Sequence, residues 1–180
     1  MQSKKIVILG ASAVGKTSII LRYLSGKFKE RTESTIGAAY SSTIFTDKKG
    51  NKEKIEIWDT AGQERYKALV PMYYRDANGA LIVYDITDKQ SIKEAHHWVD
   101  ELKSKGPDDI KIVVVGNKLD LIEGYPKTND FMESHYYVSA KSGYNIVDAF
   151  YWLITNIPKK EAKPLIIDYD EPSESTYLCC

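Results

Sequence analysis

The chain has 180 residues, and its 25 basic and 25 acidic side chains cancel to a net formal charge of zero. This length suits a single domain with one sizeable core, and the balanced charge argues against a nucleic-acid partner. The two cysteines are Cys179 and Cys180, which excludes a disulfide framework and a cysteine-based zinc site. No apolar run approaches the length of a membrane span, so we expect the protein on the cytosolic side.

The first predicted strand, residues 4–9, leads directly into a loop with glycines at both ends. Residues 10–17 read G-A-S-A-V-G-K-T, which fits the G-x-x-x-x-G-K-S/T pattern of a phosphate-binding loop. The glycines let the backbone curl so that its N–H groups point at phosphates, Lys16 adds a cation, and Thr17 is free to bind Mg²⁺. The sequence therefore predicts that the chain binds a nucleoside phosphate.

Short apolar runs alternate with helical patterns as far as residue 157, which is typical of a largely parallel sheet covered by helices. We expect strands over residues 4–9, 41–46, 54–58, 79–84, 110–115 and 136–138. Helical periodicity is clearest at Ile19, Ile20, Tyr23, Leu24, Ile92, Ala95, Val99, Leu102, Ile146, Val147, Phe150 and Leu153. The turn-forming residues 47–51 are too few for a crossover helix, so the second and third strands should form an antiparallel hairpin. The order predicts an α/β P-loop NTPase fold with a six-stranded, mostly parallel sheet, one antiparallel strand and helices on both faces.

The composition changes at Pro158. From there onward prolines are mixed with charges and serines, and no periodicity remains. We therefore expect one domain over residues 1–157 and a flexible tail over residues 158–180, which ends in the two cysteines.

Four further motifs follow the phosphate loop in a fixed order. The segments are E-S-T-I-G at residues 33–37, D-T-A-G-Q at 59–63, N-K-L-D at 117–120 and S-A-K at 139–141. Each of these motifs is weak alone. Together and in this order the chain resembles a small GTPase of the Ras superfamily, Rab family, over essentially its whole length. The roles given below are what this resemblance implies.

At the phosphate end, the resemblance implies catalytic roles for Lys16, Thr35 and Gln63. Gln63 is far too weak a base to take a proton, so its role is to orient the attacking water. Thr17, Thr35 and Asp59 would bind Mg²⁺. The backbone N–H of Gly62 and that of Thr35 would contact the terminal phosphate of GTP. Loss of that phosphate on conversion to GDP would release both loops.

At the base end, the carboxylate of Asp120 would accept from the ring N–H and the amino group of guanine, a pairing that adenine cannot make. Lys118 would lie along the base, Ala140 would donate its backbone N–H to the base oxygen, and Phe28 would stack on the base edgewise. The nucleotide-contacting residues that the resemblance implies are Ser12, Ala13, Val14, Gly15, Lys16, Thr17, Ser18, Phe28, Thr35, Gly62, Asn117, Lys118, Asp120, Ser139, Ala140 and Lys141.

Residues 33–40, 56–66 and 71–75 resemble Rabs, particularly the early endosomal branch. Tyr40, Trp58 and Tyr73 match the aromatic triad that Rabs offer to effectors, although that branch more often has Phe at the position of Tyr40.

Cys179 and Cys180 resemble the double-cysteine signal for geranylgeranylation, and because two lipids anchor a protein where one is marginal, both would be needed. The implied partners are an exchange factor, a GTPase-activating protein, a GDP-dissociation inhibitor, an escort protein and GTP-state effectors. The resemblance also implies a monomer that cycles between the cytosol and the cytosolic face of membranes, where it would regulate vesicular, endocytic traffic.

The chain also departs from the family pattern. Between Asp120 and Ser139 it is shorter by roughly two to three helical turns, so we expect a loop there with at most a short helix. The arginine nearest to the transferred phosphate is Arg31, and its placement is poor for that role. Unaided hydrolysis should therefore be slow, and an activating protein must supply charge in trans.

Two other functions are compatible with the sequence. The first is a nucleotide-bound scaffold with negligible turnover, and the presence of Gln63 argues against it. The second is a P-loop kinase or ATPase, and Asp120 argues against it because the Asp120 carboxylate would face hydrogen-bond acceptors on adenine. His96, His97 and His135 have no spacing that favours a metal site, and we expect them to be solvated or half-buried.

Overall fold

The computed structural model describes residues 3–30, 32–126, 131 and 133–158. Within these ranges the strands form one sheet in the order β2-β3-β1-β4-β5-β6, in which β2 runs antiparallel to β3 and the other pairs are parallel. The strands are β1 (Ser3–Leu9), β2 (Ala38–Thr46), β3 (Lys52–Thr60), β4 (Gly79–Asp85), β5 (Lys111–Asn117) and β6 (Ser134–Tyr137). The predicted mixed sheet and its hairpin are confirmed.

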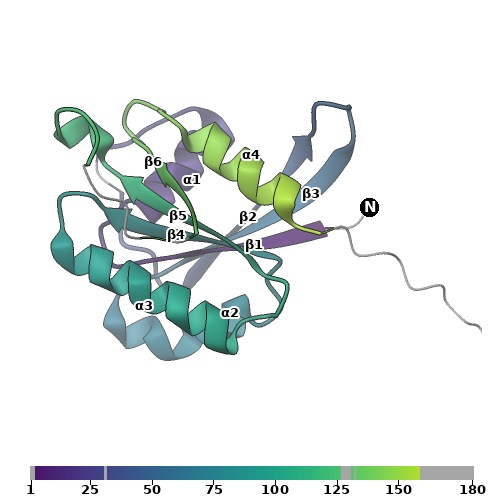
Figure 1. Ribbon diagram of the computed structural model, residues 1–180, viewed down its shortest axis with the longest axis horizontal. Helices are drawn as coiled ribbons and strands as arrows, with labels where there is room; N and C mark the ends of the chain where they lie inside the picture. The colour runs from purple at the N-terminus through teal and green to yellow at the C-terminus, as the bar shows by residue number, and fades with distance from the viewer. Residues whose placement is uncertain (1–2, 31, 127–130, 132, 159–180) are drawn as a thin grey trace, which may run out of the picture.

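Helices cover both faces of this sheet (Figure 1). The pair α1 (Lys16–Ser25) and α4 (Ile146–Asn156) lies on one face, and the pair α2 (Val70–Tyr74) and α3 (Lys89–Lys105) lies on the other. Two 3₁₀ turns, η1 (Glu64–Leu69) and η2 (Leu119–Leu121), complete the described elements. None of the helices in these ranges is both long and apolar enough to cross a membrane.

The alternation of side chains along β1 explains the two layers. Ile6 and Ile8 face α1 and α4, whereas Val7 and Leu9 face α2 and α3. All four are fully buried. Each such side chain contributes about 1.5–3 kcal/mol when it leaves water, so β1 anchors both helical layers to the centre of the sheet.

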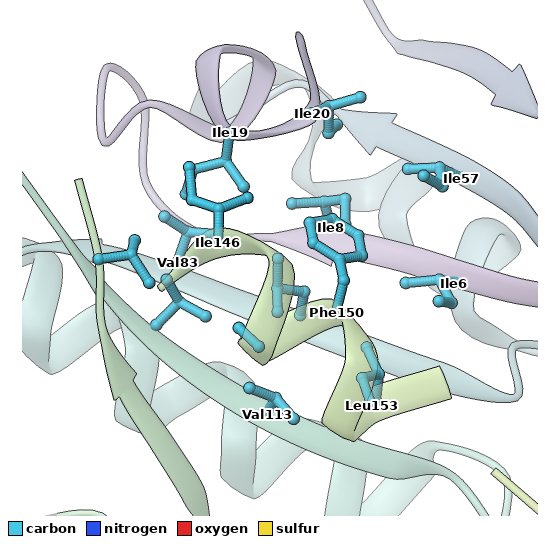
Figure 2. Packing of buried hydrophobic residues seen from close by; sticks show 14 of the residues in the cluster. Ile6, Ile8, Ile19, Ile20, Ile57, Val83, Val113, Ile146, Phe150 and Leu153 are labelled. Atoms are coloured by element: carbon cyan, nitrogen blue, oxygen red, sulfur yellow. The ribbon is translucent and has the colours of Figure 1, made fainter. Parts of the chain in front are cut away.

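On the α1–α4 side, Phe150 is the largest of the completely buried side chains. Figure 2 shows its ring among aliphatic side chains of α1 and β1. Tyr23 of α1 stacks on it with ring centroids 3.9 Å apart. This contact fixes α1, the helix that follows the phosphate loop, against α4.

Because β1, β3 and β5 run parallel, their carboxyl ends meet at one edge of the sheet. Ligands bind at this edge in open α/β sheets. The phosphate loop leaves β1 there, Asp59 is next to the last residue of β3, and Asn117 ends β5. The fold therefore brings three segments of distant sequence to one place.

Some details differ from the sequence prediction. Residues 64–74 form η1 and α2, which no apolar period indicated. Residues 127–130 and 132 lie outside the described part of the chain, and the described residues between Asp120 and Ser139 include η2 and β6 as regular elements. Arg31, the tail from residue 159, Cys179 and Cys180 also lie outside the described residues.

Candidate nucleotide-binding site

The phosphate loop presents a buried cation at the start of a helix. Lys16, the first residue of α1, is 6% exposed, and its Nζ donates to the backbone oxygens of Gly10 at 2.9 Å and Ala11 at 2.6 Å. Burial lowers the pKa of Lys16 from 10.5 to about 8. The backbone N–H groups and the positive end of the α1 dipole lie beside this ammonium group, so the loop is suited to an anion.

Three oxygen-bearing side chains meet next to the phosphate loop. The hydroxyl of Thr17 donates to Asp59 Oδ2 at 2.6 Å and lies 3.1 Å from the hydroxyl of Thr35, which in turn lies 3.4 Å from the same carboxylate oxygen. Asp59 Oδ1 is buried and makes no hydrogen bond within the described ranges. Burial raises the pKa of Asp59, and the hydrogen bond from Thr17 and the charge of Lys16 partly offset this. An uncompensated buried oxygen beside two hydroxyls fits a hard cation such as Mg²⁺.

The two loops that carry Thr35 and Gly62 are tied to each other and to the phosphate loop. The Ala61 N–H donates to the Gly37 oxygen at 2.8 Å. A Cβ at Gly62 would lie 2.4 Å from the Ala11 oxygen and 2.5 Å from Lys16 Nζ, so only glycine permits this close approach. Gln63 follows at the start of η1, on the wall of the same cavity.

At the base end, Asn117 connects β5 to both neighbouring loops. Its Nδ2 donates to the Val14 oxygen at 2.8 Å, and its Oδ1 accepts from the Ala140 N–H at 3.1 Å. Gly15 adopts φ 96°, and a Cβ there would lie 2.3 Å from Asn117 Nδ2, so the second loop glycine also makes room for this asparagine. The Ser139 hydroxyl donates to Asp120 Oδ1 at 2.5 Å.

The bond from Ala140 to Asn117 adds a detail that the motif did not predict. The amide that the sequence assigned to the base oxygen already has an acceptor in this structure. A bound base would therefore have to share this N–H with Asn117 or take it over.

A cavity of about 650 Å³ joins the phosphate end to the base end. This volume is within the range of small-molecule sites, about 300–1,000 Å³. The predicted residues that line it are Ser12, Ala13, Gly15, Lys16, Thr17, Ser18, Phe28, Thr35, Gly62, Gln63, Asn117, Lys118, Asp120, Ala140 and Lys141. The predicted residues Val14, Ser139 and Asp59 lie behind this lining and hold it through the hydrogen bonds described above.

The motifs do not include Asp85, whose carboxylate pairs with Lys118 Nζ at 2.7 Å. Burial acts to raise the pKa of Asp85, but the hydrogen bonds from Lys118 and Thr87 outweigh it and hold the pKa below its ordinary value. Asp85 is the register partner of Asn117 at the ends of β4 and β5. The signal in the sequence that could have identified Asp85 is its position as a polar residue at the end of a buried strand.

The aromatic triad forms a connected group on the surface beside these loops. Tyr40 packs edge-on against Trp58 with ring centroids 5.4 Å apart, and Trp58 lies 5.7 Å from Tyr73. Tyr40 is 50% exposed, and Ile36 and Met72 are 77% and 65% exposed. Tyr40, Ile36 and Met72 thus expose apolar groups beside the loops that line the cavity.

The sheet order, the phosphate loop and the oxygen cluster define a P-loop nucleotide-binding protein. Residues 5–159 match the sequence profile described as the Ras family. The chain belongs to the Ras family, and the resemblance to its Rab branch that the motifs indicated is confirmed by the relatives described next.

The chain is 52% identical to GTP-binding protein YPT52 of Saccharomyces cerevisiae over 139 residues, which are 73% of this chain and 59% of that protein. It is 50% identical to GTP-binding protein ypt5 of Schizosaccharomyces pombe over 121 residues, 67% of this chain and 57% of that protein. It is 44% identical to GTP-binding protein YPT53 of Saccharomyces cerevisiae over 171 residues, 87% of this chain and 77% of that protein. The matched part thus spans about three fifths of the first two relatives.

Proposed function

We propose that the protein is a switch that binds GTP and GDP with Mg²⁺ and slowly hydrolyses GTP to GDP and phosphate. The observation that carries the proposal is the meeting of Thr17, Thr35 and Asp59 beside Lys16. Thr35 comes from the loop between α1 and β2, so a ligand at this point decides whether that loop stays in place. The names of the three relatives as GTP-binding proteins support the choice of nucleotide.

Mg²⁺ bound by Thr17, Thr35 and Asp59 would supply positive charge against the phosphate oxygens. Lys16 binds the same oxygens from the other side, because its ammonium group is held in the loop by two backbone carbonyls. Gln63 and Gly62 line the same cavity. Gln63 would orient the attacking water, and the backbone N–H of Gly62 would contact the terminal phosphate.

Guanine selectivity rests on Asp120. Its carboxylate is held through one oxygen by Ser139, and it accepts from the ring N–H and amino group of guanine. Adenine offers an acceptor where guanine has the ring N–H, so a carboxylate facing adenine loses its partners. Lys118, fixed by Asp85, lies along the base, and Phe28 closes the edge of the site.

The wider role that we propose is regulation of vesicular traffic, with the endosomal system as the site of action. This follows from the resemblance to Rabs and from the triad of Tyr40, Trp58 and Tyr73, which would bind effectors in the GTP state. Tyr40 is exposed, and Trp58 and Tyr73 are half-buried beside it. Prenylation of Cys179 and Cys180 would attach the protein to the cytosolic face of membranes. An exchange factor, an activating protein, a GDP-dissociation inhibitor and an escort protein would control the cycle.

Two measurements on the purified chain test this proposal. Unlabelled GDP should displace a fluorescent guanine nucleotide, whereas ATP at the same concentration should not. In single-turnover assays, phosphate release from GTP should be slow and should accelerate with an activating protein. Equal displacement by ATP would overturn the guanine assignment, and absence of phosphate release under both conditions would favour a scaffold over a switch.

A further inference from the structure

Arg22 lies on α1, six residues after Lys16, and its side chain reaches away from its own helix to the loop that follows β6. Its Nε donates to the Ala140 oxygen at 2.9 Å, and one Nη donates to the Lys141 oxygen. The other Nη donates to the Gly26 oxygen at 2.5 Å, at the end of α1. One guanidinium group therefore binds three backbone carbonyls, two of which are more than a hundred residues away in sequence.

Two of the three carbonyls that Arg22 binds belong to residues that the proposed function places at the base, Ala140 and Lys141. Ala140 and Lys141 line the base end of the cavity, and Phe28 lies on its edge. The Phe28 ring centroid is 6.0 Å from Arg22 Cζ. Arg22 thus contacts both walls of the base end while standing outside the cavity lining.

The same loop is held from its other side by β5. Asn117 Oδ1 accepts from the Ala140 N–H, and the Gly143 N–H donates to the Ser139 oxygen at 2.8 Å. Both backbone polar groups of Ala140 are therefore bound, because its N–H donates to Asn117 and its oxygen accepts from Arg22. The loop thus has a bond to β5 and a bond of its own that do not involve Arg22, whereas the bonds from Arg22 connect the loop to α1.

We propose that Arg22 is a positioning residue that ties the base-binding loop and Phe28 to the phosphate-binding helix and thereby limits the rate at which nucleotide leaves. This inference rests on the guanine-nucleotide site proposed above. A planar guanidinium with several fixed donors can serve three carbonyls at once, and a lysine ammonium on a flexible stem cannot hold the same fork.

The test is release of fluorescent GDP from the full chain after substitution of Arg22. Arg22→Gln and Arg22→Lys should release GDP roughly tenfold faster than the unsubstituted protein, as expected for loss of about one charge-assisted hydrogen bond. Arg75→Gln is the matched control, because Arg75 is an exposed arginine at the end of α2, on the opposite face of the sheet. GDP release from this variant should occur at the unsubstituted rate.

A second ligand separates positioning from general loosening. In 6-thio-GDP, sulfur replaces the base oxygen that Ala140 would bind, while the groups that face Asp120 are retained. The unsubstituted chain should prefer GDP over 6-thio-GDP, and this preference should shrink in both Arg22 variants.

Release of GDP at the unsubstituted rate by both variants would overturn the inference. Equal acceleration for both ligands, with the preference unchanged, would also overturn it, because that result is expected when the whole fold is loosened. If the unsubstituted chain bound no guanine nucleotide, the proposed function itself would fail and this inference with it.

Discussion

Thr17 makes two separate contributions at the phosphate end, since its hydroxyl holds Asp59 and also contacts Thr35. Thr17→Asn should therefore weaken binding of Mg²⁺ and GTP much more than binding of GDP, because only the triphosphate state needs Thr35 in place. We expect roughly a tenfold or larger loss of GTP affinity, which corresponds to about 1.4 kcal/mol. Titration of both nucleotides at fixed Mg²⁺ measures it, and an unchanged GTP affinity would contradict the role of Thr17.

Gln63 lines the cavity but is not part of the phosphate loop. Gln63→Leu should leave nucleotide affinity unchanged and slow phosphate release about tenfold or more, since an apolar side chain cannot orient water. Single-turnover hydrolysis measures the rate, with nucleotide affinity as the control. An unaffected rate would remove Gln63 from the mechanism.

At the scale of secondary-structure elements, several aromatic and histidine rings pack together between β6 and α3. His135 of β6 lies between Phe131, at 5.6 Å, and Tyr137, at 4.5 Å, and its Nε2 is 2.9 Å from the Tyr84 hydroxyl. His96 of α3 stacks on Phe131 at 4.1 Å. These rings cover the end of the α2–α3 layer, next to the region where the chain is shorter than the family pattern.

Burial lowers the pKa of His135 from 6.5 to about 4. Between these two pH values the unfolded chain binds a proton that the folded chain does not, so folding stability falls as the pH drops from 6.5 towards 4. His135→Phe keeps a ring in the stack and removes the titration. Chemical unfolding at pH 7 and pH 4.5 should show a larger acid-induced loss for the unsubstituted chain than for His135→Phe. Equal losses would show that His135 does not contribute.

The sequence predicted the elements that have a clear period or a strong motif. Both the phosphate loop and the hairpin have local signals, because turn residues and glycines act within a few positions. The segment that forms η1 and α2 is short and contains Pro71 near the start of α2, so its period is too weak to detect. Arg22 and Asp85 were missed for another reason, since their partners at Ala140 and Lys118 are distant in sequence and become neighbours only through the parallel sheet.

At the scale of the whole molecule, attachment to membranes depends on residues outside the described part of the chain. Replacing both Cys179 and Cys180 with Ser should move the protein entirely to the soluble fraction of cells, because the double variant has no site for a lipid anchor. A single lipid gives only marginal membrane binding. Each single replacement should already weaken membrane association, and fractionation of cell lysates is the measurement. Membrane association of the double variant would show that another anchor exists.

The described fold combines a rigid sheet with two loops that meet at the nucleotide cavity. The Ala61 N–H to Gly37 oxygen bond connects these loops to each other. Thr35 and Gly62 line the cavity, where the proposed function places the terminal phosphate. Release of one contact at each of these residues would therefore free both loops together and alter the surface that carries Tyr40 and Trp58.

The most direct test is amide hydrogen exchange of residues 32–40 and 61–74 in the chain loaded with Mg²⁺ and either GDP or a non-hydrolysable GTP analogue. We expect slower exchange in both segments with the triphosphate and equal exchange of the central strands β1 and β4 in the two states. Identical exchange of the two segments with either nucleotide would contradict a switch controlled by the terminal phosphate.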